Sequence, residues 1–213
     1  MTNPESDRTS PPAPLDSLAA YLCGAHPDLD SALRSGRADV RPVAGAALHA
    51  LRLLPVHTGP VFRMADVPLG ALDLYQPGTT LFEPGFVAAR HDGAPREGNA
   101  LCAIWSVSGR RTALLGTPGA AHEVLFPAGS HFVVLAADLW ADGSGRTLLL
   151  TETGPDDLAD IEERLRHAAA HAPMATEDPY DRAERHWLPI GVNRRLRLFR
   201  AANGPSATGT QAS

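Results

Sequence analysis

Hydrophobic and polar residues follow two different patterns along the chain, and the pattern changes near Gly59. Before this position, apolar residues recur at the three- and four-residue spacing of amphipathic helices. The spacing predicts helices over 16–22, 28–33 and 43–54, each followed closely by glycine or proline. We therefore expect residues 15–58 to form an N-terminal helical segment.

After Gly59, short apolar runs rich in β-branched and aromatic residues are separated by glycine and proline, as is typical of strands joined by tight turns. Seven strands are predicted, over 59–64, 79–82, 85–89, 99–107, 122–126, 131–137 and 146–152. The helical stretches that link successive strands of a doubly wound parallel sheet are missing between these runs. The pattern favours an α+β fold whose core is two small packed β-sheets, with a split barrel as the alternative.

A further helix is predicted over 156–171. Its apolar stripe consists of Leu158, Ile161 and Leu165, and acidic residues occupy its first turn. We expect this C-terminal helix to pack on the outside of the sheets. In a later segment, 187–200, arginine alternates with leucine as in an edge strand.

The two ends of the chain have a different composition from the middle. Residues 1–14 are rich in proline, serine and threonine and lack apolar periodicity, and residues 201–213 are similarly polar. We expect both to be disordered tails. The predicted domain organisation is thus a tail, the helical segment 15–58, an α+β domain over 59–200, and a second tail.

Composition and charge argue against several classes of protein. The 213 residues are 44% hydrophobic and 20% charged, as in ordinary globular proteins, and the net charge of −5 offers no attraction for nucleic acid or anionic membranes. The two cysteines are too few for a disulfide framework and indicate a reducing compartment. Neither a membrane span nor a cleavable signal is visible, so we expect a cytoplasmic protein, with export by another route left open.

One histidine pair has the spacing of metal ligands. His167 and His171 lie one helical turn apart on the last predicted helix, but only alanines separate them and no glutamate adjoins them. Histidines are also favoured near a helix C-terminus, because a positive charge interacts well with the helix dipole there. We therefore expect no metal site.

Two charged residues lie at positions where an apolar strand would otherwise be expected. Arg63 ends the run Pro60-Val-Phe-Arg, and an arginine facing inward from a strand requires an anion or a carboxylate partner. Glu123 begins the run Glu-Val-Leu-Phe-Pro-Ala-Gly-Ser-His-Phe, which continues into another apolar strand. We expect the two residues to lie on neighbouring strands. A structural ion pair for Arg63 and an ordinary strand-end carboxylate for Glu123 remain alternatives.

The Glu123 run, together with the run that ends at Arg63 and the segment Pro84-Gly-Phe86, resembles the NAD-dependent ADP-ribosyltransferases of the Arg–Ser–Glu class over roughly residues 45–153. The resemblance implies the ADP-ribosyltransferase fold for the domain over 59–200, with NAD as substrate and an unknown acceptor. The resemblance is also compatible with a protein as a further binding partner. No metal is implied, because nicotinamide leaves the cationic ring as a neutral molecule.

The resemblance also implies roles for individual residues. Glu123 would be the catalytic residue that stabilises the oxocarbenium-like ribose, and Arg63 would bind the NAD pyrophosphate. Phe86 and Trp105 would bind the cofactor, although both also suit a hydrophobic core. The implied activity is ADP-ribosyl transfer or NAD hydrolysis at the nicotinamide N-glycosidic bond.

The chain departs from the family pattern at two places. Ala88, Ala89 and Arg90 occupy the positions of the family's Ser-Thr-Ser, whose hydroxyls support the catalytic glutamate. Ser106 and Ser108 are the nearby hydroxyls that could replace them. Ala121 stands where arginine-modifying members carry an acid or amide, so arginine is expected to be a poor acceptor. The loss of hydroxyls at Ala88 and Ala89 favours the alternative function, a catalytically degenerate module that acts in binding or protein interaction, whereas the retention of Arg63 and Glu123 in the family's order favours the enzyme.

Overall fold

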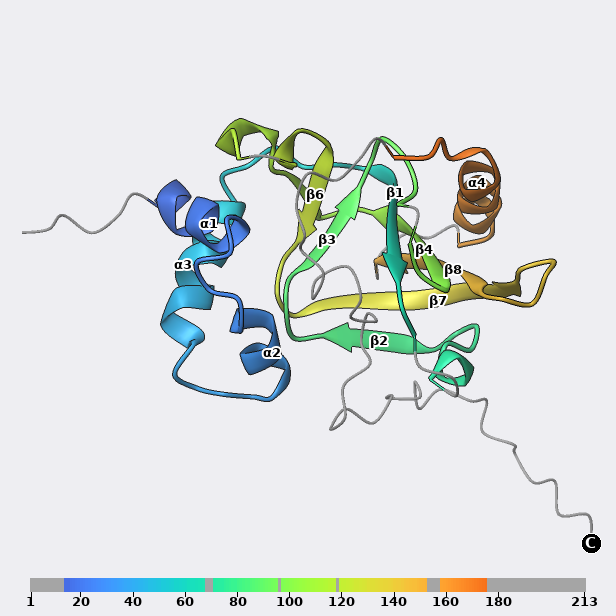
Figure 1. Ribbon diagram of the computed structural model, residues 1–213, viewed down its shortest axis with the longest axis horizontal. Helices are drawn as coiled ribbons and strands as arrows, with labels where there is room; N and C mark the ends of the chain where they lie inside the picture. Colours follow the sequence, from blue (N-terminus) through green and yellow to red (C-terminus); the bar gives the residue numbers. More distant parts are fainter. Residues whose placement is uncertain (1–13, 68–70, 96, 118, 153–157, 176–213) are drawn as a thin grey trace, which may run out of the picture.

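A computed structural model of the chain describes residues 14–67, 71–95, 97–117, 119–152 and 158–175. Three helices come first, eight strands follow, and a fourth helix closes the described part (Figure 1). The helices are α1 (Pro14–Leu22), α2 (Leu29–Arg34), α3 (Arg41–Leu51) and α4 (Leu158–His171). The strands are β1 (Gly59–Ala65), β2 (Thr80–Glu83), β3 (Val87–Arg90), β4 (Ala100–Ser106), β5 (Arg110–Arg111), β6 (Glu123–Phe126), β7 (Ser130–Leu139) and β8 (Arg146–Glu152).

The eight strands form one sheet that nearly divides in two. Their order is β2-β7-β8-β4-β1-β3-β6-β5, and only β4 and β8 run parallel. β1 pairs with β4 along its whole length, but with β3 it shares the single register pair Phe62–Arg90. The predicted α+β fold is confirmed, and the two expected sheets are the halves β2-β7-β8-β4-β1 and β3-β6-β5, joined at that pair.

The main hydrophobic core is formed by side chains from both halves of the sheet. Alternate residues of each strand face it, as the two-residue period of a β-strand requires. Its fully or almost fully buried members include Val61, Leu81, Val87, Ala89, Cys102, Ile104, Val124, Phe126, Phe132, Val134, Leu148 and Leu150. Burying each large apolar side chain contributes roughly 1.5–3 kcal/mol, so this shared core holds the halves together although few backbone pairs join them.

The helices cover the two halves separately. Side chains of α1 and α3 pack with Phe86, Ala88 and Leu125 of the β3-β6 half, and α4 packs against the other half (Figure 1). In α4 the predicted stripe is only partly right: Ile161 and Leu165 are buried, whereas Leu158 is 44% exposed. Leu158 is exposed because it is the first residue of α4, at the helix end.

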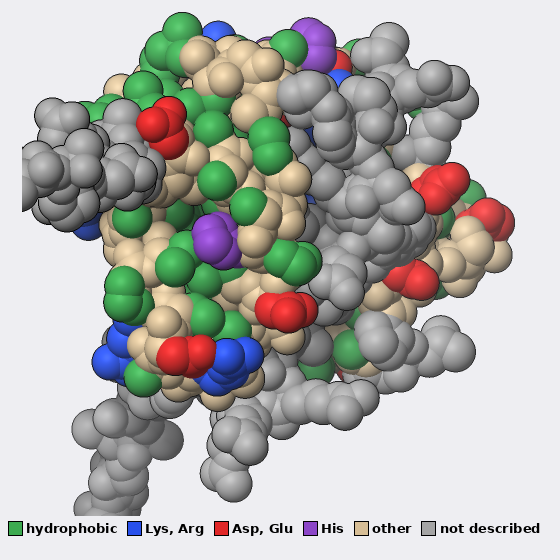
Figure 2. Space-filling model, turned by 60° about the vertical axis from the view of Figure 1, so that its left-hand side comes forward, with side chains coloured by type: hydrophobic (Ala, Val, Ile, Leu, Met, Phe, Trp, Pro, Cys, Tyr) green, Lys and Arg blue, Asp and Glu red, His purple; other side chains and the backbone are tan. Residues whose placement is uncertain are grey.

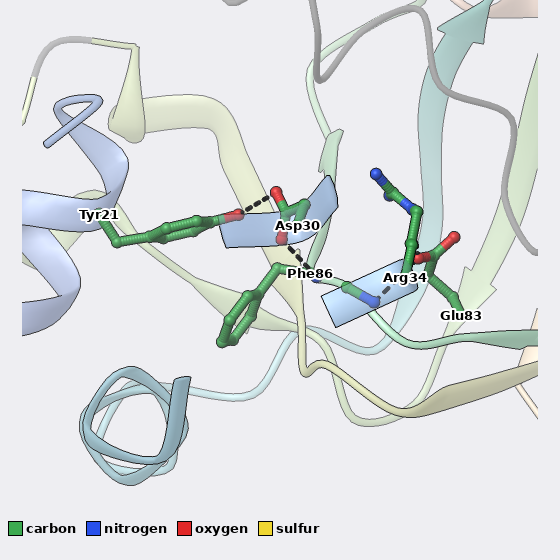
Figure 3. A network of polar contacts seen from close by, with 6 residues as sticks. Tyr21, Asp30, Arg34, Glu83 and Phe86 are labelled. Carbon is green, nitrogen blue, oxygen red and sulfur yellow. Dashed lines mark hydrogen bonds and ion pairs between the residues drawn. The ribbon is translucent and has the colours of Figure 1, made fainter. Parts of the chain in front are cut away.

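The helical segment is fastened to the β2–β3 turn by a buried polar network (Figure 3). The Tyr21 hydroxyl donates to one oxygen of Asp30 at 2.7 Å, and the other oxygen accepts the Phe86 backbone N–H at 2.9 Å. Arg34 Nε donates to Glu83 at 2.8 Å, and the same Glu83 oxygen accepts the Gly85 N–H. Residues of α1 and α2 thus fix the backbone that leads into β3.

All seven predicted strands and all four predicted helices are present, with ends shifted by a few residues, and β5 is an additional short strand. Pro14, expected to lie in the N-terminal tail, begins α1. The remainder of that tail, the edge strand over 187–200 and the tail over 201–213 lie outside the described residues. Within the part that the structure describes, no helix has the length and apolar character needed to cross a membrane.

Candidate functional site

Glu123 is the first residue of β6 and lies where the smaller half of the sheet meets the preceding loop. Its antiparallel partner in β3 is Arg90, and the next pair on the same face is Ala88 with Leu125. Glu123 and Ala88 are therefore diagonal neighbours on one face of the sheet. The first of the three positions matched to the Ser-Thr-Ser motif by resemblance thus lies beside the glutamate, and it carries a methyl group.

A hydroxyl does reach Glu123, from the opposite side of β6. The Thr112 hydroxyl lies 3.3 Å from Glu123 Oε1, and the Thr112 backbone N–H donates to the Glu123 carbonyl at 3.1 Å. Thr112 follows directly on β5, in which Arg111 pairs with Val124 of β6. Thr112 is fully buried and Glu123 is 7% exposed. The carboxylate is therefore held in a largely enclosed setting by a neutral donor.

Arg90 forms a bidentate ion pair with Asp92. Its Nε and Nη2 donate to the two carboxylate oxygens at 2.9 and 2.7 Å. Burial raises the pKa of Asp92, but the hydrogen bond and charge of Arg90 outweigh this and hold the pKa below its usual value. Arg90 is only 7% exposed, so it is part of the folded site and not a solvated strand end.

Three histidine rings lie in a row next to this pair. His57 stacks on His91 with ring centroids 5.4 Å apart, and His91 meets His122 at 5.7 Å. His122 Nδ1 is 3.7 Å from Asp92, and Arg111 Nε donates to His57 Nδ1 at 3.2 Å. Burial lowers the pKa of both His57 and His91, and the nearby Arg111 charge lowers both further. Both rings are therefore neutral at pH 7.

Arg63 lies in the part of the molecule where β1 and β3 diverge. It follows Phe62, the residue that pairs β1 with β3, and its Nη1 donates to the Ala88 carbonyl at 3.1 Å. It is 3% exposed, and burial lowers its pKa. The expectation that Arg63 and Glu123 occupy neighbouring strands is wrong, because β3 lies between β1 and β6.

The two aromatic residues predicted to bind the cofactor lie in apolar clusters. Phe86 is 3% exposed and contacts Tyr21 of α1, with ring centroids 4.9 Å apart. Trp105 lies under α4, with the Arg164 guanidinium carbon 5.9 Å from the centre of its ring. These contacts agree with the core alternative for both residues, and their roles in binding NAD remain predictions.

Two hollows lie on the face that carries the N-terminal helices, at the other end of β6 from Glu123. Figure 2 shows this face, with hydrophobic side chains distributed over much of it and several charged ones close together near its lower edge. The hollows measure about 480 and 330 Å³ and share Leu48, Ala128 and Gly129 as lining residues. Neither lining includes Glu123 or Arg63, so these hollows are not part of the candidate site.

The hydroxyls proposed as replacements lie elsewhere. Ser106 donates to the His57 carbonyl at 2.8 Å, and Ser108 donates to the Glu152 carboxylate at 2.5 Å. Sequence reasoning missed Thr112 because it lies after a two-residue strand that has no periodic pattern.

The pair His167 and His171, which has the spacing of metal ligands, lies on α4 with its ring centroids 4.3 Å apart. Among the described residues, no cluster of histidine, cysteine or acidic side chains is suited to a metal ion.

The sequence is similar to that of a Mycobacterium avium (strain 104) protein, Mav, that is named for NAD(+)–arginine ADP-ribosyltransferase activity. The two are 35% identical over an alignment of 156 residues, and the match covers 68% of this chain. The chain spans about a fifth of the length of this relative, 19%. No protein-family model matches the chain.

Solved structures with the same fold come from bacterial ADP-ribosyltransferases. The Vis toxin of Vibrio splendidus, an ADP-ribosyltransferase, is 17% identical with a TM-score of 0.54, covering 69% of this chain and 76% of its own. Exoenzyme S of Pseudomonas aeruginosa, solved with human 14-3-3 protein beta and bound to carba-NAD, is 16% identical with a TM-score of 0.57, covering 68% and 76%. The catalytic domain of VsdC from Aeromonas hydrophila is 19% identical with a TM-score of 0.56, covering 65% and 98%. The expected ADP-ribosyltransferase fold is confirmed.

Proposed function

Because this chain has the fold of the ADP-ribosyltransferases and resembles one of them in sequence, we propose that it cleaves NAD at the nicotinamide N-glycosidic bond and transfers ADP-ribose to an acceptor or to water. The observation that carries the proposal is the placement of Glu123. It is a largely buried carboxylate at the head of β6, beside the Ser-Thr-Ser position on β3 and in contact with the Thr112 hydroxyl.

The proposed chemistry needs one negative charge held at a fixed place. When the bond between the ribose and nicotinamide breaks, its electron pair goes to the ring nitrogen, and the ribose acquires positive charge. The Glu123 carboxylate stabilises that charge, and a preorganised group of this kind lowers the barrier most in an enclosed site. The acceptor oxygen or nitrogen then bonds to the ribose and loses its proton.

We propose that the main role of Arg63 is structural. Its guanidinium joins β1 to the Ala88 carbonyl of β3, and at 3% exposure it has little surface for a ligand. The contact with the NAD pyrophosphate, which the family resemblance implies, remains a prediction with its own test in the Discussion.

Two observations bear on the acceptor in opposite directions. The Mycobacterium avium relative is named for arginine as acceptor, whereas Ala121 provides no acid or amide two residues before Glu123. We propose water or a nucleophile other than arginine. NAD turnover in buffer should therefore increase little when agmatine is added, and strong formation of ADP-ribosyl-agmatine would contradict this choice.

The alternative function is a module that keeps the fold and has lost catalysis. The replacement of the motif hydroxyls by Ala88 and Ala89 favours it. The two functions are separated by incubating the protein with millimolar NAD and measuring free nicotinamide. The transferase proposal expects release that falls about 10²- to 10⁴-fold in Glu123→Gln, the range typical of a positioned acid–base group.

The control for this experiment is Glu163→Gln, which removes the same charge from an exposed position on α4. It should leave nicotinamide release and the melting temperature unchanged. Release by the native chain no greater than that of buffer would overturn the transferase proposal and favour the degenerate module.

A further inference from the structure

Glu123 is supported from a different side than the family pattern implies. The Ser-Thr-Ser positions belong to β3, and in this chain they carry Ala88, Ala89 and Arg90. β3 therefore offers no hydroxyl to the carboxylate at these positions. The other neighbour of β6 is β5, and Thr112 follows it directly.

We propose that Thr112 is the positioning residue of Glu123, and that its hydroxyl has taken the place of the hydroxyls missing from β3. This inference rests on the proposed function, because it gives Glu123 its catalytic role. Thr112 does not act on NAD itself. It acts through the orientation of the carboxylate.

The geometry gives the Thr112 hydroxyl a choice among three acceptors. It lies 3.3 Å from Glu123 Oε1, 3.2 Å from the Ala120 carbonyl and 3.4 Å from the Glu123 carbonyl. A hydroxyl has one proton to donate, and a bond to an ionised carboxylate is about twice as strong as one between neutral groups. Of the three acceptors, which lie at similar distances, the carboxylate oxygen Oε1 therefore forms the strongest bond.

The Thr112 backbone keeps the hydroxyl in place. Its N–H donates to the Glu123 carbonyl at 3.1 Å, and the Leu115 N–H donates to the Thr112 carbonyl at 2.9 Å. Thr112 is 0% exposed, so water does not compete for the hydroxyl. The β-branched side chain has few rotamers available, which limits the entropy lost in holding this orientation.

The position of Thr112 also fits its role. A group on β3 would approach Glu123 from the side of Arg90, whose guanidinium is paired with Asp92. Thr112 approaches from the other side and brings no charge. Thr112 thus contacts the carboxylate through a neutral hydroxyl.

The inference predicts different outcomes for two substitutions of the same residue. Thr112→Val keeps the shape and removes the hydroxyl, and Thr112→Ser keeps the hydroxyl. Thr112→Val should lower kcat for nicotinamide release about tenfold or more, while the KM for NAD changes less than twofold. The loss of kcat corresponds to an increase of about 1.4 kcal/mol or more in the activation barrier. Thr112→Ser should keep most of the native kcat.

The matched control is Thr151→Val. Thr151 is also 0% exposed and its hydroxyl donates to the Glu152 carbonyl, but it lies on β8, and three strands stand between β8 and β6 in the sheet order. The Thr151→Val variant should lose about as much stability as Thr112→Val and should retain the native kcat. Equal losses of kcat in Thr151→Val and Thr112→Val would show a general effect of destabilisation and would overturn the inference.

A second measurement does not depend on turnover. In protein labelled with ¹³C at the glutamate side-chain carboxyls, the Glu123 resonance is the one that disappears in Glu123→Gln. The inference expects that resonance to shift in Thr112→Val and to stay near its native position in Thr112→Ser and Thr151→Val.

The two proposals fail in different ways. If the native chain releases no nicotinamide, the proposed function fails, and the carboxyl resonance still decides whether Thr112 holds Glu123. If the native chain is active and Thr112→Val keeps the native kcat and the native resonance, the positioning role is overturned while the proposed function stands.

Discussion

Arg90 is the cross-strand partner of Glu123, yet its guanidinium forms a bidentate ion pair with Asp92. Side chains directly opposite each other in an antiparallel pair have Cβ atoms roughly 4.5–5.5 Å apart. An arginine at that position can reach the glutamate, and an ion pair between them would neutralise the charge that the proposed chemistry requires. Asp92 therefore engages the guanidinium that lies opposite Glu123 in the sheet.

This relationship predicts the effect of Asp92→Asn. The variant removes the charge that engages Arg90, so we expect Arg90 to turn to Glu123 and nicotinamide release to fall about tenfold or more, since hydrogen bonds to charged groups are worth about 1.5–3 kcal/mol. The measurement is the initial rate of nicotinamide release from NAD. Adding Arg90→Gln to Asp92→Asn should recover much of the activity, and a double variant as weak as Asp92→Asn alone would contradict this account.

A substitution of Arg63 can distinguish a structural role of this residue from a role in binding NAD. Arg63→Met keeps the length of the apolar stem and leaves the buried Ala88 carbonyl without this donor. An unpaired buried acceptor costs about 1–3 kcal/mol, so the free energy of unfolding should fall by that amount in urea titrations. The control is Arg164→Met, at an exposed position on α4, where the change should be within about 0.5 kcal/mol. Native stability combined with a large loss of NAD affinity would instead favour the pyrophosphate role.

The neutral histidines predict a loss of stability in mild acid. Burial and the Arg111 charge lower the pKa of His57 and His91 from the ordinary value of 6.5. The unfolded chain therefore binds protons below about pH 6.5 that the folded chain does not, and stability must decrease as the pH falls through this window. Protonation of both rings would also bring two positive charges together in a stack with centroids 5.4 Å apart.

The measurement for this prediction is the melting temperature between pH 7.5 and 5. The double variant His57→Gln and His91→Gln should show a shallower decrease than the native chain. His26→Gln, at an exposed position, should keep the native slope. Equal slopes in all three proteins would show that His57 and His91 do not control acid stability.

The packing of α4 predicts opposite results for two aspartates on the same helix. Ile161 is 6% exposed and packs with Phe62 and Ala103, so Ile161→Asp buries an unpaired charge and should cost at least about 3 kcal/mol. Leu158 is 44% exposed at the first position of α4. Leu158→Asp should be nearly neutral, because a negative charge is favourable at a helix N-terminus. Thermal denaturation of both variants tests the prediction, and similar melting temperatures would show that α4 does not dock through Ile161.

The candidate catalytic glutamate could be found from the chain alone, because the residues that mark it are contiguous. Glu123 precedes an apolar strand and a Pro-x-Gly turn, and this local order is what carries the family resemblance. The same holds for the strand that contains Arg63. The supporting residues could not be found in this way. Thr112 and Asp92 lie in irregular segments without periodicity. Their roles depend on contacts with Glu123 of β6 and Arg90 of β3, which the fold brings next to them.

The strands, the helices and the α+β class could be predicted from the chain, because alternation, helical spacing and turn residues act between near neighbours. The tertiary structure decided which strand lies beside which. It placed β3 between β1 and β6 and so separated Arg63 from Glu123, it placed Trp105 under α4, and it brought Thr112 to the carboxylate. These contacts join residues distant in the chain, and they depend on strand register and on the packing of the shared core, which no local pattern of residues specifies.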